Sequence, residues 1–352
     1  MKAIRSLSIL ITIASLCSCQ KDANSNHYGL DEGNEAQVYV SLDFGDKSQT
    51  KSSNYVTAET YETQVNDVQV ILFDEAGNLN AYVDADTETS GITIKTTTGS
   101  KTIWAVVNGP NLSRVTTLDE LRNTSIDLGD NSKSADKGFV MAGSTSFVLG
   151  KDNSSVSISV SRFVARITLQ TITCELPSAY GMITIKNVML TNVVGNQNLA
   201  GDAAITTWYN KMGREQNNLN QSIIDGVLYQ PAWSDLTFAS LNESLGTGWV
   251  YFPFTPPTFY TYPNNTTYDV EGWDSTFTDR KTRLVVTAVI GSETYYYPIV
   301  LDSPARNTAN TIDLTITGLG SKDPDEPVQK EALNVSVAIE EWASGTFYNE
   351  TI

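Results

Sequence analysis

Apolar and polar residues alternate with a period of two along much of this chain, and this period constrains the fold more than any other feature. The alternation is unbroken in residues 37–44 (QVYVSLDF), 156–160 (VSISV) and 333–339 (LNVSVAI). A half-buried β-strand has this period, whereas an amphipathic helix repeats about every 3.6 residues. Because segments with a helical period are few, we expect an all-β fold: two β-sandwich domains in tandem with one or two short helices.

Composition excludes several classes of function. The 352 residues include one histidine, His27, which argues against Ser-His-Asp hydrolysis, Cys-His proteolysis and histidine-rich metal sites. A net charge of −17 argues against nucleic acid as a partner. The sequence has no CxxC pair and no Gly-rich phosphate loop, and residues 323–327 (DPDEP) indicate a solvated linker rather than a calcium loop. We expect no catalytic residue, no metal, no cofactor and no enzymatic activity.

The N-terminal residues predict export and a lipid anchor. Lys2 and Arg5 precede an apolar run at 7–16, which is the pattern of a secretory signal. The Leu-Cys-Ser-Cys sequence that follows resembles a bacterial lipobox and predicts acylation of Cys19. An ordinary signal peptide with incidental cysteines is the alternative. If the lipobox is used, the membrane is contacted only through the lipid of the precursor, and Cys174 remains as a buried, unpaired side chain.

Two strands near opposite ends of the chain carry the same pattern of four apolar residues. The first strand has Val38, Val40, Leu42 and Phe44, and the second has Leu333, Val335, Val337 and Ile339, followed by Trp342. The polar segment 45–54 after the first strand offers Lys47 and Lys51 to a trypsin-like protease. Two interchangeable strands and a cuttable loop suggest strand exchange between subunits. On the pattern alone, however, two ordinary edge strands are the favoured interpretation.

These features divide the chain into four parts. We expect a lipoprotein signal peptide at 1–18 and a propeptide at 19–51 that contains a removable strand at 38–44. An N-terminal β-sandwich domain then covers 52–176, up to the Leu-Pro-Ser turn that begins at Leu176. A C-terminal β-sandwich domain covers 177–352 and contains the donor strand 333–342.

Several motifs, taken in order, resemble one family. The sequence RFVARI at 162–167 is similar to an R-x-x-A-R motif that closes the N-terminal domain of the fimbrillins, the type V pilins of Bacteroidetes. The segments 68–77 (VQVILFDEAG), 104–109 (WAVVNG) and 306–320 resemble other motifs of that family, as does the final strand that ends in Trp342. The resemblance covers both ends of the chain and both expected domains, and it is to the major subunits of the FimA type.

The resemblance implies a fold and a mechanism. The domains should have the transthyretin-like Greek-key topology, and the protein should be a pilus stalk subunit at the cell surface. A trypsin-like protease cuts after Lys51 or Lys47, the lipidated strand leaves, and the C-terminal strand of the next copy takes its place. The implied partners are other copies of the chain, accessory tip and anchor subunits, and the processing protease. Adhesion and biofilm formation are the expected outcome.

Three other functions stay open. A surface glycan-binding lipoprotein could use the aromatic and proline-rich segment 251–262 (YFPFTPPTFYTY) to stack sugars, although a rigid loop over a sandwich edge is the favoured account of that segment. A tip or anchor subunit of the same family is the third possibility. A hydrolase would have carboxylate chemistry alone.

Overall fold

The structure is a computed structural model, and it describes residues 33–45, 55–56, 58–131, 138–152, 154–212, 222–224, 227–230, 236–267, 279–326, 328 and 333–342. All of them belong to one compact unit, Asp31–Ile352. Within these ranges lie 24 strands and two short α-helices, so the predicted all-β fold is confirmed. None of the helices in the described ranges is long and apolar enough to span a membrane.

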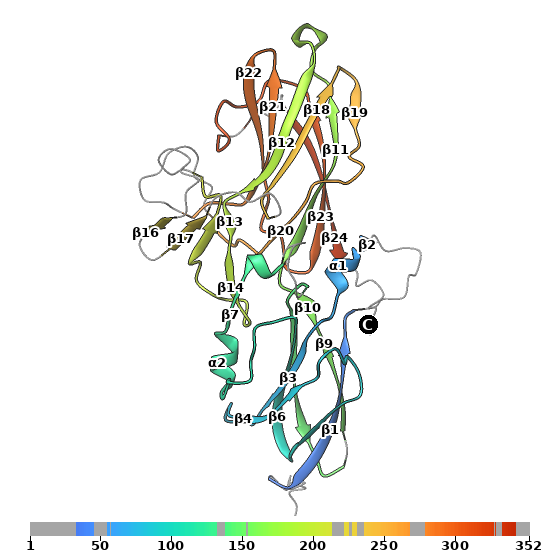
Figure 1. Cartoon of the computed structure of the whole chain (residues 1–352), viewed down its shortest axis with the longest axis vertical. Coiled ribbons are helices and arrows are strands. Elements are labelled where there is room, and N and C mark those ends of the chain that lie inside the picture. The colour runs from blue at the N-terminus through green and yellow to red at the C-terminus, as the bar shows by residue number, and fades with distance from the viewer. Residues whose placement is uncertain are drawn as a thin grey trace, which may run out of the picture. The chain divides into compact units, whose positions relative to one another are not determined.

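Two facing sheets form the N-terminal half (Figure 1). The smaller sheet has the order β5–β1–β9, with β5 (Ile92–Thr97), β1 (Glu35–Asp43) and β9 (Ser154–Ser159). The larger sheet has the order β10–β8–β6–β3–β4, with β10 (Ser161–Arg162), β8 (Met141–Leu149), β6 (Gly99–Val107), β3 (Val68–Phe73) and β4 (Leu79–Asp84). All six side chains of β3 are buried, because this strand lies between β6 and β4 and both of its faces are covered.

Apolar side chains from both of these sheets meet in one cluster. It includes Val38 and Val40 from β1, Ile94 from β5, Val70 from β3 and Ile103 from β6. The opposite face of the larger sheet packs into a second cluster that continues into the C-terminal half. Helix α2 (Leu118–Arg122) covers part of that opposite face with the buried Leu121, and a capping box between Thr117 and Glu120 begins it.

Two further sheets form the C-terminal half. One has the order β19–β11–β23–β24–β2, with β20 also paired to β11; the strands are β19 (Trp249–Tyr251), β11 (Ala165–Cys174), β23 (Thr308–Ile316), β24 (Leu333–Trp342), β2 (Tyr55–Val56) and β20 (Thr258–Thr261). The other has the order β18–β12–β21–β22, with β18 (Phe238–Leu245), β12 (Ile183–Thr191), β21 (Arg283–Ile290) and β22 (Glu293–Val300). Buried residues of both sheets share one apolar core.

Short elements connect the halves. Two small sheets have the orders β13–β15–β17–β16 and β14–β7, with β13 (Val193–Val194), β15 (Thr207–Tyr209), β17 (Val227–Gln230), β16 (Ser222–Ile224), β14 (Asn196–Asn198) and β7 (Ser125–Asp127). Helix α1 (Thr60–Thr63) follows β2, and short 3-10 helices lie at Leu128–Asn131 and Ser178–Tyr180. Because β14 belongs to the second half of the chain and β7 to the first, their pairing ties the two halves together.

Sheet membership changes earlier than the expected domain boundary after residue 176. Strand β10 is the last member of the N-terminal sheet, whereas β11 pairs with β19, β20 and β23. The changeover therefore falls inside the motif at 162–167. Strand periodicity could not reveal it, because alternation indicates that a strand is half-buried and not which strands flank it. The division of the chain into domains stays a prediction, since Asp31–Ile352 forms a single compact unit.

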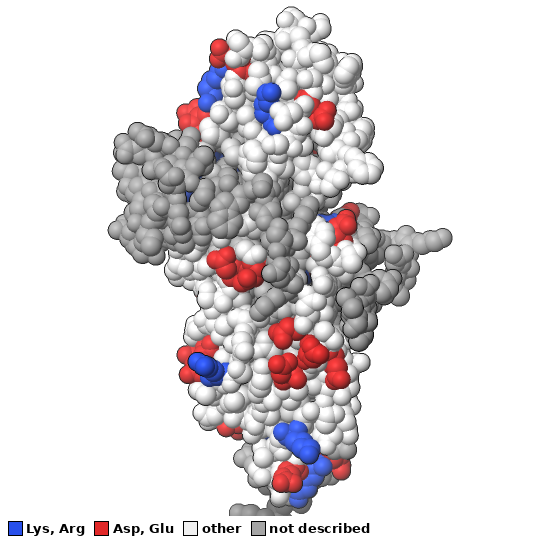
Figure 2. Space-filling model, viewed as in Figure 1, with Lys and Arg blue, Asp and Glu red and all other residues white. Residues whose placement is uncertain are grey.

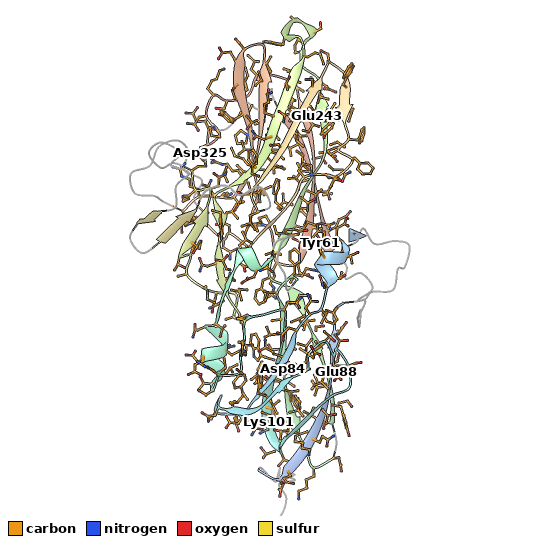
Figure 3. The ribbon with its side chains drawn as sticks, in the orientation of Figure 1. Tyr61, Asp84, Glu88, Lys101, Glu243 and Asp325 are labelled. Atoms are coloured by element: carbon orange, nitrogen blue, oxygen red, sulfur yellow. The ribbon has the colours of Figure 1, made fainter. Side chains whose placement is uncertain are left out.

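Acidic side chains gather on the N-terminal half of one face (Figure 2). Asp84 and Glu88 are both exposed and lie in that half (Figure 3). The visible acidic groups and the net charge of −17 agree in sign.

Candidate functional site

Strand β1 is the middle strand of the smaller N-terminal sheet. It pairs antiparallel with β5 from Glu35↔Thr97 to Val40↔Ile92, and parallel with β9 from Val38↔Ser154 to Asp43↔Ser159. Val38 and Val40 are 0% and 1% exposed. Of the remaining predicted core residues, Leu42 and the adjoining Phe44 are partly buried and pack against the same cluster. Withdrawing β1 would therefore expose two strand edges and an apolar groove between them.

Strand β24 has the same alternation but a different environment. It pairs antiparallel with β23 over nine residues, from Thr308↔Glu341 to Ile316↔Leu333. Val335, Val337 and Ile339 are 37%, 43% and 66% exposed, although their spacing is typical of a buried face. Leu333 packs partly against the core. The strand is thus held mainly by backbone hydrogen bonds to one neighbour.

Strand β2 follows β1 in the sequence and pairs with the end of β24. Tyr55 and Val56 pair in parallel with Glu341 and Trp342, at the end of β24. The segment that joins β1 to β2 contains Lys47 and Lys51, and both residues lie outside the described ranges. Cys19, the signal peptide and the side chain of Trp342 lie outside them as well. The predicted lipidation and cleavage positions therefore remain predictions.

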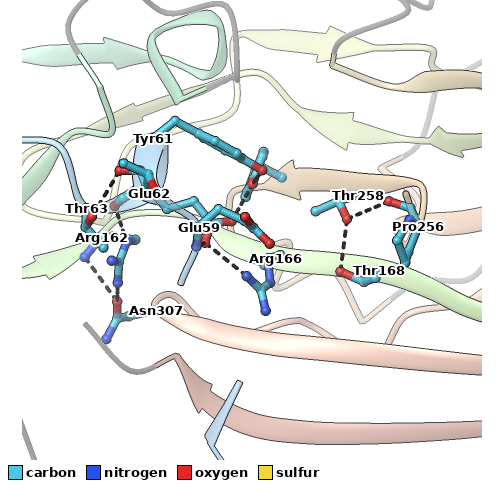
Figure 4. Close-up of polar contacts among 12 residues, drawn as sticks. Glu59, Tyr61, Glu62, Thr63, Arg162, Arg166, Thr168, Pro256, Thr258 and Asn307 are labelled. Atoms are coloured by element: carbon cyan, nitrogen blue, oxygen red, sulfur yellow. Dashed lines mark hydrogen bonds and ion pairs between the residues drawn. The ribbon is translucent and has the colours of Figure 1, made fainter. Parts of the chain in front are cut away.

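A buried polar cluster holds the segment that follows β2 (Figure 4). In α1, Glu62 is fully buried and accepts hydrogen bonds from Arg166 Nη1 at 2.9 Å and from the Tyr260 hydroxyl at 2.5 Å. Arg162 Nε donates to the backbone carbonyl of Glu62 at 2.9 Å. The two arginines of the motif at 162–167 thus bind one element, and their residue types are explained by the carboxylate and carbonyl they contact.

Burial changes the acidity of this cluster. It raises the pKa of Tyr61 to about 12, and it also raises that of Tyr260 above the usual tyrosine value. Burial lowers the pKa of Arg162 to about 10, because the charged guanidinium loses water. Tyr61 and Tyr260 share a hydrogen bond of 2.8 Å between their hydroxyls. Near neutral pH, the phenols of Tyr61 and Tyr260 are therefore neutral.

Asp325 is buried, and the solvated-linker interpretation is wrong for it. The residue lies in the predicted linker 323–327 and is 2% exposed. Its carboxylate accepts hydrogen bonds from Arg280 and Arg283, both buried (Figure 3 labels Asp325). No local sequence signal could have shown this, because the two arginines precede Asp325 by 45 and 42 residues.

The aromatic segment 251–262 divides between surface and core. Phe252 is 68% exposed and Phe254 is fully exposed, whereas Phe259 and Tyr262 are buried. Residues Thr258–Thr261 form β20 against β11, so this part of the segment does cover an edge of the sandwich.

Metal binding and thiol chemistry have no evident site in the described residues. Within those ranges no group of three or more His, Cys, Asp or Glu side chains could hold a metal ion. Cys174 is fully buried, as predicted from its place in an apolar strand. The described residues thus contain a strand buried between two neighbours, a strand with exposed apolar side chains and a buried polar cluster.

The described residues thus form an all-β fold with one strand buried between two others and a strand of the same pattern next to the edge of its sheet. A family model described as "Major fimbrial subunit protein (FimA)" matches residues 36–213, just over half of the chain. The chain belongs to this family of fimbrial subunits, which are structural proteins and not enzymes. Its place is therefore in a cell-surface fimbria.

Solved structures share the fold. A fimbrilin from Porphyromonas gingivalis has a TM-score of 0.61 at 15% identity, over 91% of this chain and 99% of that one. A candidate cell adhesion protein from Bacteroides eggerthii has the same TM-score at 21% identity, over 88% and 97%. The tip fimbrial protein Mfa3 of Porphyromonas gingivalis is less similar, with a TM-score of 0.51 at 13% identity, over 88% and 100%. No curated protein sequence matches the chain.

Proposed function

We propose that this protein is the stalk subunit of a fimbria, exported as a lipoprotein on Cys19, matured by cleavage after Lys51 or Lys47, and polymerised by donor-strand exchange. The observation that carries the proposal is the contrast between β1 and β24. Both segments have four alternating apolar residues. In the first, Val38 and Val40 are buried in a core and Leu42 and Phe44 are partly buried, whereas three of the four in β24 are substantially exposed. A strand whose apolar side chains are exposed to solvent gains free energy when those side chains enter an apolar groove.

The gain on exchange is large enough to hold a polymer. Four apolar side chains buried at about 1.5–3 kcal/mol each contribute roughly 6–12 kcal/mol before entropic costs. About six main-chain hydrogen bonds add on the order of 1 kcal/mol each. Because β1 fills the groove before cleavage, the uncut protein should stay monomeric. Once a donor strand is seated it leaves only over a high barrier, so the polymer should persist kinetically.

The topology also supports a direction for the exchange. Strand β1 runs antiparallel to β5 and parallel to β9, and a donor that adopts its direction keeps both ladders. In that direction the donor strand enters at the Glu35 end of the groove, and Leu333 takes the place of Val38, which pairs with Ser154 at the start of β9. The subunit that donates the strand then lies beyond the Glu35 end of the groove, which is opposite the end that leads to the loop of Lys47 and Lys51.

Anchoring and partners follow from the same scheme. The lipid on Cys19 holds the precursor at the outer membrane, and cleavage separates the lipid from the polymerising body. The partners are further copies of this chain, tip and anchor subunits, and a trypsin-like protease. Fimbriae of such subunits would support adhesion and biofilm formation.

A second candidate function rests on one observation. Phe252 and Phe254 expose aromatic rings beside β19, which is a surface suited to stacking a sugar. A glycan-binding lipoprotein would retain its lipid and would not polymerise, so sequencing the N-terminus of protein sheared from cells separates the two functions. A start at Ser52 or Ser48 supports the fimbrial subunit, and a blocked Cys19 supports the anchored binder.

Substitutions on the two faces of β24 test the exchange. We expect Val337→Asp or Ile339→Asp to leave a folded, secreted protein that does not polymerise, because a carboxylate cannot enter the apolar groove. Ser336→Asp, on the other face of the same strand, is the matched control and should polymerise. Filaments of normal length from Ile339→Asp and Val337→Asp, seen by electron microscopy, would refute the assignment of β24 as donor.

A further inference from the structure

The linker between β23 and β24 is attached to the C-terminal sheet by a buried ion pair. Asp325 stands between the two strands in sequence, and its carboxylate contacts the guanidinium groups of Arg280 and Arg283. The side chains of the three residues are at most 3% exposed. Arg283 Nη1 also donates to the backbone carbonyl of Asp325 at 2.6 Å. Side chain and backbone are therefore both held at this one residue.

The linker before Asp325 is also fixed, by contacts with β22. Ser321 and Tyr296 exchange backbone hydrogen bonds of 2.8 and 2.9 Å. The Tyr297 hydroxyl donates to the carbonyl of Gly318 at 3.0 Å. These contacts and the ion pair hold the chain from residue 318 to Asp325 against the body of the subunit, independently of where β24 lies.

The length of chain after Asp325 limits the reach of β24. Asp325 lies beside Arg283, the first residue of β21, whereas Leu333 lies at the level of Ile290, the last residue of that strand. The level of Leu333 follows from its pairing with Ile316, which in turn pairs with Cys174 at the end of β11. Strand β12 begins shortly afterwards in the sequence, and its first residue pairs with Ile290. Eight residue steps from Asp325 to Leu333 cover at most about 26–29 Å. The eight residues of β21 themselves cover roughly 23–26 Å. The chain after Asp325 therefore has little spare length.

We propose that Asp325, bound by Arg280 and Arg283, is the anchor of the donor strand: a positioning residue that fixes where β24 leaves its own subunit and how far it reaches into the next. The proposal rests on donor-strand exchange. With the anchor intact, the released chain starts beside Arg283, at the first residue of β21, and the spacing between subunits is set by residues 326–332 alone. Tension along the fimbria passes into the sheet at Arg280 and Arg283.

A buried ion pair suits this role because it fixes position more than it adds stability. Charged groups that are buried together gain little net stability, because the cost of their desolvation offsets their attraction. Their position is well defined, however, because a carboxylate bound by two guanidiniums cannot shift without losing these contacts. A linker held by apolar contacts alone could slide by a residue and shift the register of the donor strand. The same contacts that define the register also resist pulling in the direction of the strand.

Two insertions of the same length separate an anchor from a plain linker. Four Gly-Ser residues placed between Glu326 and Pro327 lie after the anchor, and the same four placed between Lys322 and Asp323 lie before it. We expect the insertion after the anchor to lengthen or blur the axial repeat of filaments in electron micrographs, and the insertion before it to leave the repeat unchanged. Equal effects of the two insertions, or no effect of either, would overturn the proposal.

Hydrogen exchange on polymerised protein provides the second measurement. We expect Asp325→Asn to raise the exchange rates of the amides at 318–326 at least tenfold and to speed filament disassembly in denaturant. Glu326→Gln is the matched control, since Glu326 is exposed and adjacent, and should behave as the parent protein does. Parent-like exchange and persistence in Asp325→Asn filaments would contradict the anchor. If the parent protein forms no filaments after cleavage, it is the proposed function that fails, and the two failures are distinguishable.

Discussion

At the scale of single residues, the buried contacts of Glu62 explain why the motif at 162–167 carries two arginines. Arg166 neutralises the carboxylate and Arg162 binds the backbone of the same residue. Helix α1 follows β2, which comes after the predicted cleavage loop, so this cluster would still hold the start of the mature chain if the propeptide were removed. In the described structure the two arginines of the motif bind Glu62 of α1.

Removing the charge of Glu62 tests this role. We expect Glu62→Gln to lower the free energy of unfolding by about 3–5 kcal/mol, because the guanidinium of Arg166 loses its buried counter-charge. Urea unfolding followed by circular dichroism measures the change. Glu88→Gln removes an exposed carboxylate and is the control, with an expected change of about 0.5 kcal/mol or less. Equal stabilities of the two variants would contradict the importance of the cluster.

The raised pKa of Tyr61 predicts a pH dependence. A group whose pKa is higher in the folded state contributes stability that is present below its unfolded pKa and is lost as the pH rises through the folded value. For Tyr61 the window runs from pH 10 to about 12. Thermal unfolding should show a steeper loss of stability there in the parent protein than in Tyr61→Phe. Identical slopes in the two proteins would show that Tyr61 does not contribute.

At the scale of elements, β1 and β24 have one pattern and two environments. The buried position of β1 between β5 and β9 makes it part of the N-terminal core, whereas β24 borders its sheet with three apolar side chains partly in solvent. Before cleavage, β1 should therefore matter for stability and β24 should not. After cleavage, assembly should depend on β24 and no longer on β1.

A pair of substitutions tests that contrast in the uncut protein. We expect Val40→Asp to cost roughly 3–5 kcal/mol of stability, because it buries a carboxylate among apolar residues. Val337→Asp should cost about 1 kcal/mol or less, since that side chain is 43% exposed. Chemical denaturation of both variants provides the comparison. A larger cost for Val337→Asp than for Val40→Asp would contradict the two environments.

Elements with strong local signals were predictable from the sequence, and long-range pairings were not. The alternation in β1 and β24 and the capping box of α2 each depend on neighbouring residues, and each is found in the structure. The sheet that β11 joins and the burial of Asp325 depend on residues far away in the chain. A charged residue in a Pro-bearing segment is typical of a solvated linker, and only the placement of Arg280 and Arg283 makes Asp325 an exception.

At the scale of the whole molecule, acidity belongs to the body of the subunit. Without residues 1–51 the chain keeps 18 basic and 34 acidic residues, a net charge of −16. Subunits of like charge repel each other before they meet, and the repulsion reaches about 30 Å at 0.01 M salt but only about 8 Å at 0.15 M. The charge should keep the polymer soluble and slow the encounter of its subunits.

Ionic strength should therefore control the rate of assembly. We expect cleaved subunits to polymerise roughly tenfold faster at 0.15 M than at 0.01 M sodium chloride, because screening reduces the repulsion. Light scattering after addition of the protease measures the rate, with a separate gel to confirm that cleavage itself is equally fast. Slower assembly at the higher salt concentration would indicate attraction between charged surfaces instead.

The central claim, that the groove left by β1 receives β24 of another copy, is tested most directly by disulfide formation across that groove. Thr93 of β5 is exposed and pairs with Tyr39 of β1, so a donor strand places an outward-facing residue opposite it. Thr93→Cys is combined in turn with Asn334→Cys, Ser336→Cys and Ala338→Cys, because a cysteine pair across neighbouring strands is within bonding distance. After cleavage and oxidation, one of the three should give a ladder of covalent multimers on a non-reducing gel. The uncut protein and Thr93→Cys alone should stay monomeric. Filaments that form without a ladder from any of the three pairs would contradict strand exchange at this groove.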